Sequence, residues 1–265
     1  MAKIGNYNVK KKIGEGGFGR VFQAEHILLG TDACLKQNIR ATEADADLLM
    51  YESKLIWKLE DYHSIPKVKD FYRTDKDEAV MVMSFIDGST LEDIVQKKGA
   101  LHPEDASWIM ERLLGALYFI HSYGVVHTDI KPQNVFVEPN KRDIKLIDFG
   151  LASYKPKSTT LPVGFSPKYA APELMLGKPP IPETDYYGAG IVMLRALGGD
   201  VSKKSFRPDT PKEIVEFCNK LLLYDPLQRP RWENGILIQE LSEVRQQVFG
   251  RRHADSDKHV KGGKD

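Results

Sequence analysis

The stretch VVHTDIKPQNVFV, residues 125–137, decides the fold of this chain. It sets several ionisable and polar side chains between two short β-branched runs, where burial is expected. After a polar turn at residues 138–143, an apolar run ends at Asp148. The carboxylates of Asp129 and Asp148 and the amide of Asn134 are then expected to converge at strand ends. Such oxygen ligands suit a magnesium ion and phosphate chemistry.

The bulk composition is that of an ordinary globular protein. The chain has 265 residues, of which 42% are hydrophobic and 28% charged, enough for one large core or two lobes. A net charge of +1 gives no field that would favour a nucleic acid or a membrane as partner. Two distant cysteines, no apolar leader and no membrane-length apolar run predict a cytoplasmic protein.

The first third of the sequence predicts a small antiparallel sheet and one helix. Residues 7–37 alternate apolar and polar side chains in three runs, and residues 67–74 and 78–86 form two more. Thr42 is followed three residues later by an acid, as in a helix cap, and apolar residues then recur at helical spacing. Glu52 falls on the inner face of that helix, whereas Glu43 is expected at its surface.

The remainder of the chain is expected to be mainly helical. Pro103 suits a first helical turn, and apolar residues recur every three to four positions, so a buried helix is predicted at 103–122. Further helices are predicted at 184–197, 211–223 and 233–248. Residues 250–265 are predicted to form a flexible polar tail, since they lack aromatic side chains.

Two features of the first third point to a phosphate ligand. Residues 14–21 follow the pattern G-x-G-x-x-G-x-V, which allows close approach of the backbone to phosphates, although a plain glycine hairpin is an equal alternative. A strand rather than a helix follows, which argues against a dinucleotide fold. Lys36 lies on the inward face of the third predicted strand. Lysines on strands are usually solvated, but apolar neighbours favour burial here, with Glu52 as the partner.

Taken together, these motifs resemble the protein kinase family from about Tyr7 to Phe249. The resemblance implies an α+β fold with two lobes, an N-lobe at 7–86 and a C-lobe at 87–249. The matching segments, in the family's order, are Gly14–Val21, Ala33-x-Leu35-Lys36, Glu52, His127–Asn134, Asp148-Phe149-Gly150, Ala171-Pro172-Glu173, Asp185-x-x-x-x-Gly190 and Arg229.

The resemblance also implies roles for individual residues. Lys36, held by Glu52, is expected to contact the ATP phosphates, and Asn134 and Asp148 to hold Mg2+. Asp129 is expected to orient the acceptor hydroxyl and take its proton, and Lys131 to steady the γ-phosphate. The remaining nucleotide-binding residues implied are Gly14, Gly16, Gly17, Phe18, Gly19, Val21, Ala33, the gatekeeper Met83 and the hinge residues Ser84, Phe85 and Ile86.

The substrate implied is a protein with a serine or threonine acceptor. Lys131, two positions after the catalytic Asp, is the form found in serine/threonine kinases, and Ser166 stands where the family bonds the catalytic Asp. Glu173 and Arg229 are expected to form a buried pair that supports the substrate segment, and His127 to be a packing residue. The expected oligomeric state is a monomer by default.

Two positions depart from the family pattern. Thr128 replaces the Arg that clamps a phosphate on the activation loop, so the enzyme is expected not to need loop phosphorylation. Ser158, Thr159 and Thr160 remain phosphorylatable, or simply solvated. Arg195 replaces a frequent Glu and is expected to disfavour basic substrates, with a surface Arg as the alternative.

Two other functions remain open at this stage. A pseudokinase, acting as a nucleotide-binding scaffold, would normally lack one of Lys36, Asp129, Asn134 or Asp148, and all four are present. A small-molecule kinase of the aminoglycoside or choline type shares the Asp and Asn. Such enzymes generally lack the Ala-Pro-Glu segment and the lysine at 131.

Overall fold

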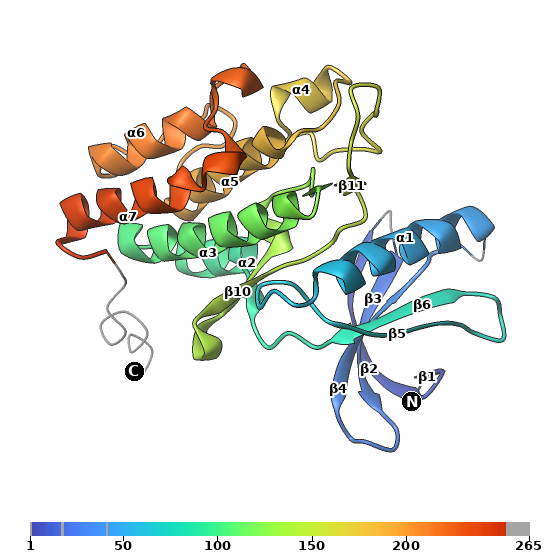
Figure 1. Ribbon diagram of the computed structural model, residues 1–265. Coiled ribbons are helices and arrows are strands. Elements are labelled where there is room, and N and C mark those ends of the chain that lie inside the picture. The colour runs from blue at the N-terminus through green and yellow to red at the C-terminus, as the bar shows by residue number, and fades with distance from the viewer. Residues whose placement is uncertain (1, 17–18, 41, 253–265) are drawn as a thin grey trace, which may run out of the picture. The chain divides into compact units, whose positions relative to one another are not determined.

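The computed structural model describes residues 2–16, 19–40 and 42–252, and the chain divides into two compact units. The N-terminal unit comprises Met1–Asp87 with Asp148–Gly150, and the C-terminal unit comprises Gly88–Ile147 with Leu151–Asp265. The N-terminal unit is built on a sheet and the C-terminal unit on helices (Figure 1). Of the predicted tail, all but residues 250–252 lies outside the described residues.

The N-terminal unit contains a six-stranded antiparallel sheet in the order β1-β2-β3-β4-β6-β5. One face of the sheet is apolar because alternate side chains of each strand turn to the same side; Ala24, Leu35, Val80 and Val82 form the centre of this core. Lys36, the residue after Leu35, turns to the other face of β4. The three strands predicted at 7–37 and the two predicted at 67–86 are all present. The strands are β1 (Lys3–Ile4), β2 (Tyr7–Gly16), β3 (Gly19–His26), β4 (Asp32–Gln37), β5 (Val68–Arg73) and β6 (Ala79–Ser84).

One helix, α1 (Glu43–Leu59), packs against β5 and β6. The Thr42 hydroxyl accepts a hydrogen bond from the Asp45 backbone N–H at 3.2 Å, so the helix begins where the sequence predicts. Glu52 is buried on the inner face of the helix. Glu43 is exposed in the first turn, where it accepts hydrogen bonds from Arg73.

The C-terminal unit is a bundle in which α3 packs against α5 and α7, and α6 against α5 and α7 (Figure 1). The four predicted long helices are present. The helix at 103–122 has the predicted ends, and the other three have ends shifted by one to three residues. The short α2 and α4 are additional. The helices are α2 (Leu91–Lys98), α3 (Pro103–Ser122), α4 (Pro172–Met175), α5 (Pro182–Ala196), α6 (Lys212–Leu221) and α7 (Ile236–Phe249).

Short strands and 3-10 turns of the C-terminal unit carry the stretch that opened the sequence analysis. β9 pairs with β10 and with β7, while β8 pairs with β11, in each case antiparallel. The polar residues of the stretch lie between β8 and β9. The elements are β7 (Ser89–Thr90), β8 (Val125–Val126), β9 (Val135–Glu138), β10 (Asp143–Leu146), β11 (Ser153–Tyr154), η1 (Pro132–Asn134), η2 (Pro139–Lys141), η3 (Pro226–Gln228) and η4 (Trp232–Asn234).

None of the helices in the described part of the chain combines the length and the apolar character needed to cross a membrane.

Candidate active site

Lys36 is the centre of a buried ionic group in the N-terminal unit. Its side chain is 8% exposed and that of Glu52 is 3% exposed. The Lys36 ammonium group donates to both carboxylate oxygens of Glu52 and to Oδ1 of Asp148, each at 2.8 Å. Burial by itself would lower the pKa of Lys36, but the two carboxylates outweigh burial and raise it. The lysine therefore stays charged and is fixed in position.

The glycine hairpin joins β2 to β3 in the same unit. Gly19 has φ of +151°, and a Cβ built on it would lie 2.7 Å from the Gln37 carbonyl oxygen, so this glycine is required by the fold itself. A Cβ on Gly16 would meet nothing within 4 Å, and one on Gly14 would meet Val21 at an ordinary 3.7 Å. The predicted nucleotide contacts Gly17 and Phe18 lie outside the described residues.

The predicted adenine-binding residues follow the end of β6. Met83 pairs with Cys34 of β4, and Ser84 pairs with Ala33. Met83, Ser84 and the next two predicted residues, Phe85 and Ile86, are half-buried. Burial raises the pKa of the Cys34 thiol to about 12, so the thiol is not poised for nucleophilic or redox chemistry.

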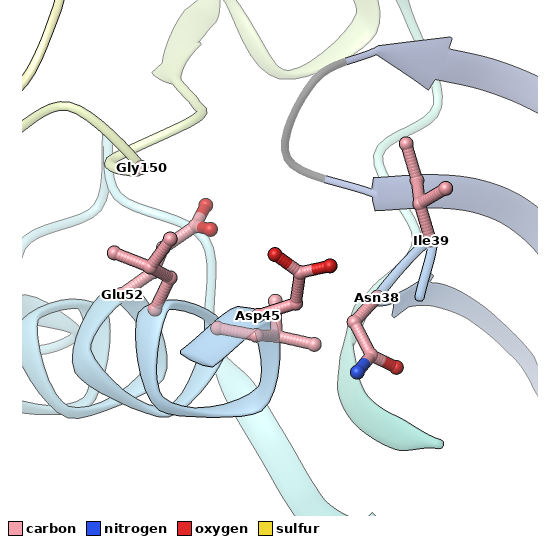
Figure 2. Close-up of a pocket in the computed structure, with 7 residues that line it drawn as sticks. Asn38, Ile39, Asp45, Glu52 and Gly150 are labelled. Atoms are coloured by element: carbon pink, nitrogen blue, oxygen red, sulfur yellow. The ribbon is translucent and has the colours of Figure 1, made fainter. Parts of the chain in front are cut away.

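A pocket in the N-terminal unit lies beside α1 (Figure 2). The Glu52 and Asp45 carboxylates reach it from the helix, and Asn38 lies on the other side. Its volume of about 20 Å³ suffices for a water molecule but not for a nucleotide. The pocket is therefore not the nucleotide site.

Asp129 lies at the centre of a polar network in the C-terminal unit. Its Oδ2 accepts hydrogen bonds from the Lys131 ammonium at 2.6 Å and from the Asn134 amide at 3.2 Å. The Asn134 amide also donates to the Asp129 carbonyl at 2.9 Å, which fixes the orientation of the amide. Lys131 donates at 2.9 Å to the Ser166 hydroxyl. The network thus joins three residues of the opening stretch to Ser166.

The loop that carries Asp129 is held by Asp185 of α5. The Asp185 carboxylate accepts from the backbone N–H groups of His127 and Thr128, both at 2.8 Å, and bonds His121 Nε2 at 2.9 Å. Gly188 lets α5 approach closely, because a Cβ there would lie 2.6 Å from Ile130 Cβ. Asp185 belongs to a motif that matches the family, but the sequence alone did not indicate its role. The available signal was an acid in the first turn of the helix predicted at 184–197, among mostly apolar neighbours, a place where a charge needs partners.

His127 is a packing residue, as predicted. Its Nδ1 accepts from the Asp129 backbone N–H at 3.3 Å, and this contact leaves the proton on Nε2. Nε2 then donates to the Ile147 carbonyl at 3.1 Å. With both nitrogens engaged, the imidazole is placed to shape the loop rather than to act as a base.

Thr128 has an unusual backbone conformation. Its φ is +66°, which is strained for a β-branched residue. Besides the N–H bond to Asp185, its hydroxyl donates to the Leu151 carbonyl at 2.6 Å. The hydroxyl thus ties the loop of Asp129 to the start of the segment that continues to Ser166.

Glu173 and Arg229 form the predicted buried ion pair. Two parallel hydrogen bonds of 2.7 and 2.9 Å join them, and their side chains are 3% and 0% exposed. Arg229 also donates to the carbonyls of Glu183, Leu223 and Tyr224. One guanidinium therefore connects α4, α5 and the segment that follows α6.

The surface cation predicted at Arg195 is neutralised. Arg195 donates to both oxygens of Glu92 in α2, at 3.1 and 2.8 Å, and its side chain is only 22% exposed. These hydrogen bonds also lower the pKa of the Glu92 carboxyl. The sequence pattern did not reveal α2, so Glu92 could not be identified as the partner.

The sequence-family model for the protein kinase domain matches residues 7–239 of this chain. The chain belongs to the protein kinase family. Its fold is the two-lobed kinase fold, in which the sheet of the N-terminal unit is the N-lobe and the helical C-terminal unit is the C-lobe.

Curated relatives of this kinase domain carry serine/threonine kinase names. A probable serine/threonine-protein kinase KIN1 homolog of Enterocytozoon bieneusi is 32% identical over 202 residues, 76% of this chain and 34% of the relative. A carbon catabolite-derepressing protein kinase of Candida tropicalis is 32% identical over 202 residues, 74% of this chain and 32% of the relative. Serine/threonine-protein kinase PrkC of Bacillus subtilis is 27% identical over 250 residues, 85% of this chain and 38% of the relative. The chain thus spans about a third of the length of these relatives.

Proposed function

We propose that this chain is a serine/threonine protein kinase that transfers the γ-phosphate of ATP to a serine or threonine hydroxyl, with magnesium. The observation that carries the proposal is the network in which Asp129 accepts hydrogen bonds from Lys131 and Asn134 while Lys131 also bonds Ser166. A carboxylate so placed is suited to orient an acceptor hydroxyl and take its proton. The kinase domain is proposed to extend over residues 7–249.

The N-terminal unit supplies groups that fit a nucleotide triphosphate. Open space around Gly16 leaves room for phosphates close to the backbone. Lys36 is charged and fixed by Glu52 and Asp148, as a phosphate-binding ammonium must be. The half-buried residues 83–86 offer an apolar surface and backbone groups for adenine, whereas the side chain of Ala33 is buried in the core on the face of β4 opposite Lys36.

The donor set fits magnesium. Within the described residues there is no group of three or more His, Cys, Asp or Glu side chains that would hold a metal on its own. Magnesium needs no such cage, since it takes one or two protein oxygens and completes its shell with water and phosphate oxygens. Asn134 and Asp148 would supply those oxygens, and the bonds from the Asn134 amide nitrogen to Asp129 leave its Oδ1 as the ligand atom. When bound, magnesium neutralises charge on the phosphates.

Two alternatives have less support. A pseudokinase scaffold is disfavoured because Lys36, Asp129, Asn134 and Asp148 are all present. A small-molecule kinase is disfavoured by the buried Glu173–Arg229 pair, which supports the segment expected to hold a protein substrate. The names of the curated relatives also favour protein substrates.

The test is incubation with labelled ATP and magnesium, using peptide libraries in which the acceptor is serine, threonine or tyrosine. We expect label on serine and threonine peptides, with Asp129→Asn as the inactive control. Equal labelling by that variant would mean a contaminating kinase. Absence of transfer to any peptide, with ATP still bound, would instead favour the scaffold, and label on aminoglycosides or choline alone would favour the small-molecule alternative.

We also propose a cytoplasmic, monomeric protein that acts without nucleic acid or membrane partners. Cys34 and Cys218 are both unpaired and neither is exposed, which fits a reducing compartment. The net charge of +1 provides no broad basic field.

Glu52→Gln is expected to lower kcat/KM for ATP by about 10- to 100-fold. A hydrogen bond between charged groups contributes about 1.5–3 kcal/mol, and the amide keeps the shape of Glu52 but not its charge. Lys36 would then retain Asp148 as its carboxylate partner. The measurement is steady-state kinetics against ATP concentration, with Glu43→Gln, at the exposed start of the same helix, as the matched control. An unchanged kcat/KM would show that the ion pair does not prepare the lysine.

We further propose that loop phosphorylation is not needed, because the Thr128 hydroxyl already ties the Asp129 loop to Leu151. Thr128→Val keeps the β-branched shape and backbone strain but removes the donor, and it is expected to lower kcat of unphosphorylated protein by about tenfold. Thr128→Ser, which restores the hydroxyl, is expected to recover most of that loss.

Changing Ser158, Thr159 and Thr160 together to alanine tests the same proposal by removing the residues that could be phosphorylated. Thr160 makes a local turn, accepting from the Lys157 backbone N–H at 2.8 Å. We expect kcat of the triple variant to stay within about twofold of the wild-type value, since exposed substitutions of this kind have small effects. A collapse of activity, restored by phosphomimetic residues, would contradict the proposal.

A further inference from the structure

The segment that follows the Asp148 motif carries exposed charge of one sign. Between Leu151 and Pro182 the lysines at 155, 157, 168 and 178 are all exposed. The one acid in that stretch, Glu173, is buried against Arg229. With the chain as a whole near neutrality, at +1, this is a local concentration of positive charge.

Part of this segment lies directly beside the loop of Asp129. Lys131 bonds the Ser166 hydroxyl at 2.9 Å, and the Gln133 amide bonds the Tyr169 hydroxyl at 2.9 Å. A peptide whose hydroxyl reaches Asp129 must therefore pass close to residues 166–169. Lys168 is the exposed charged side chain among them, and its ammonium lies 5.4 Å from the centre of the Tyr169 ring.

A second exposed lysine reaches the same cluster of residues from the segment between α5 and α6. Val201 of that segment is buried in one cluster with Tyr169 and Tyr187. Lys204, three residues on, places its ammonium 5.0 Å from the centre of the Tyr187 ring. The ammonium groups of both lysines thus lie close to tyrosine rings of one buried cluster, next to the loop of Asp129.

An acid that could offset Lys168 is already engaged. The charge of Lys168 helps to lower the pKa of Glu92. Both oxygens of Glu92 nevertheless accept hydrogen bonds from Arg195, and one also accepts from Gln96. Glu92 and Arg195 offset one another, so the charge of Lys168 remains. Asp200, four residues before Lys204, accepts hydrogen bonds from Ser202 and from the Lys203 backbone N–H. Selection by charge in this region therefore depends on the lysines and not on Arg195.

We propose that Lys168 and Lys204 form a basic substrate-binding face that selects protein substrates with acidic residues flanking the acceptor serine or threonine. The proposal rests on the proposed function and names its substrate class. Each contact between a peptide carboxylate and an exposed ammonium contributes little free energy. The free energies of two such contacts add, so their effects on kcat/KM multiply. An arginine at the same peptide position would be repelled.

The test compares peptides that share one acceptor serine and carry Glu, Gln or Arg at the flanking positions. We expect wild-type kcat/KM to rank Glu above Gln above Arg, with Glu exceeding Gln by about three- to tenfold. The Glu preference should shrink as salt rises from about 0.1 M to about 1 M, where the Debye length falls from ~10 Å to ~3 Å. Lys168→Gln/Lys204→Gln should bring the Glu-to-Gln ratio to within about twofold.

Lys220→Gln is the matched control, since it removes the same charge from an exposed lysine at the end of α6, paired with Glu240. It should keep the wild-type ranking, and equal melting temperatures would exclude misfolding. A wild-type preference for Arg peptides, or a Glu preference that survives the double substitution, would overturn the inference. So would binding of single-stranded RNA that the double variant loses without any peptide preference. Failure of the proposed function is a different result, in which no peptide of any charge is phosphorylated.

Discussion

Asp129→Asn is expected to lower kcat for peptide phosphorylation by a factor of about 10²–10⁴, the range contributed by a positioned general base. Asparagine has the same shape and can still accept a hydrogen bond from Lys131, which lies 2.6 Å from Oδ2 in the wild type. It cannot take a proton from the acceptor hydroxyl. The loss should therefore appear in kcat, while the dissociation constant for ATP with magnesium changes little.

Asp209→Asn provides the control for this experiment. Asp209 is an exposed carboxylate of the same unit that pairs with Arg207 at the surface, and its replacement should leave kcat near the wild-type value. Single-turnover measurements separate the chemical step from product release. If Asp129→Asn kept its kcat to within a few-fold, Asp129 would not be the base, and the proposed mechanism would fail with it.

Much of the fold was predictable because local patterns agree with the tertiary structure. Strand alternation located β2 to β6, and the Thr42 cap located the start of α1. The pairing of Lys36 with Glu52 followed from the cost of burying a lone charge, which leaves few alternatives for a lysine among apolar neighbours. In these cases a local pattern, or the need of one buried charge for a partner, is enough to predict the structure.

The parts that could not be predicted depend on residues distant in sequence. Asp185 lies 57 and 58 residues from the backbone groups it holds, and no local pattern encodes that distance. Glu92 lies 103 residues from Arg195, in a helix of only eight residues, and local sequence does not reveal a partner at that separation. The sequence indicated only that Thr128 lacks the guanidinium of the usual arginine. The hydrogen bond it makes to Leu151 depends on a left-handed backbone that the sequence does not announce.

Asp185 and Arg229 perform related tasks in the C-terminal unit. Asp185 is an acceptor for two backbone N–H groups of the Asp129 loop, and Arg229 is a donor to three backbone carbonyls besides Glu173. Each buried charge is compensated by several hydrogen bonds to backbone groups, most of which lie outside helices and strands. The two charges therefore fix segments that regular secondary structure does not hold.

Arg229→Met is expected to destabilise the C-terminal unit by about 3–5 kcal/mol. The substitution leaves the Glu173 carboxylate buried without its cation and removes the donor from the carbonyls of Glu183, Leu223 and Tyr224. At about 2–4 °C per kcal/mol for a unit of this size, the melting temperature should fall by roughly 10 °C. Differential scanning calorimetry measures this loss directly.

Glu173→Gln should cost less than Arg229→Met, because the three backbone carbonyls still accept from the guanidinium and the amide keeps one acceptor oxygen. The double variant Glu173→Leu/Arg229→Met should be more stable than Arg229→Met alone, since it leaves no uncompensated buried charge. Arg207→Met, at an exposed arginine of the same unit that, among the described residues, pairs only with the exposed Asp209, is the matched control and should shift the melting temperature by no more than a few degrees. If the double variant were as unstable as Arg229→Met, the lost bonds to the carbonyls, and not the stranded Glu173 charge, would account for the whole cost.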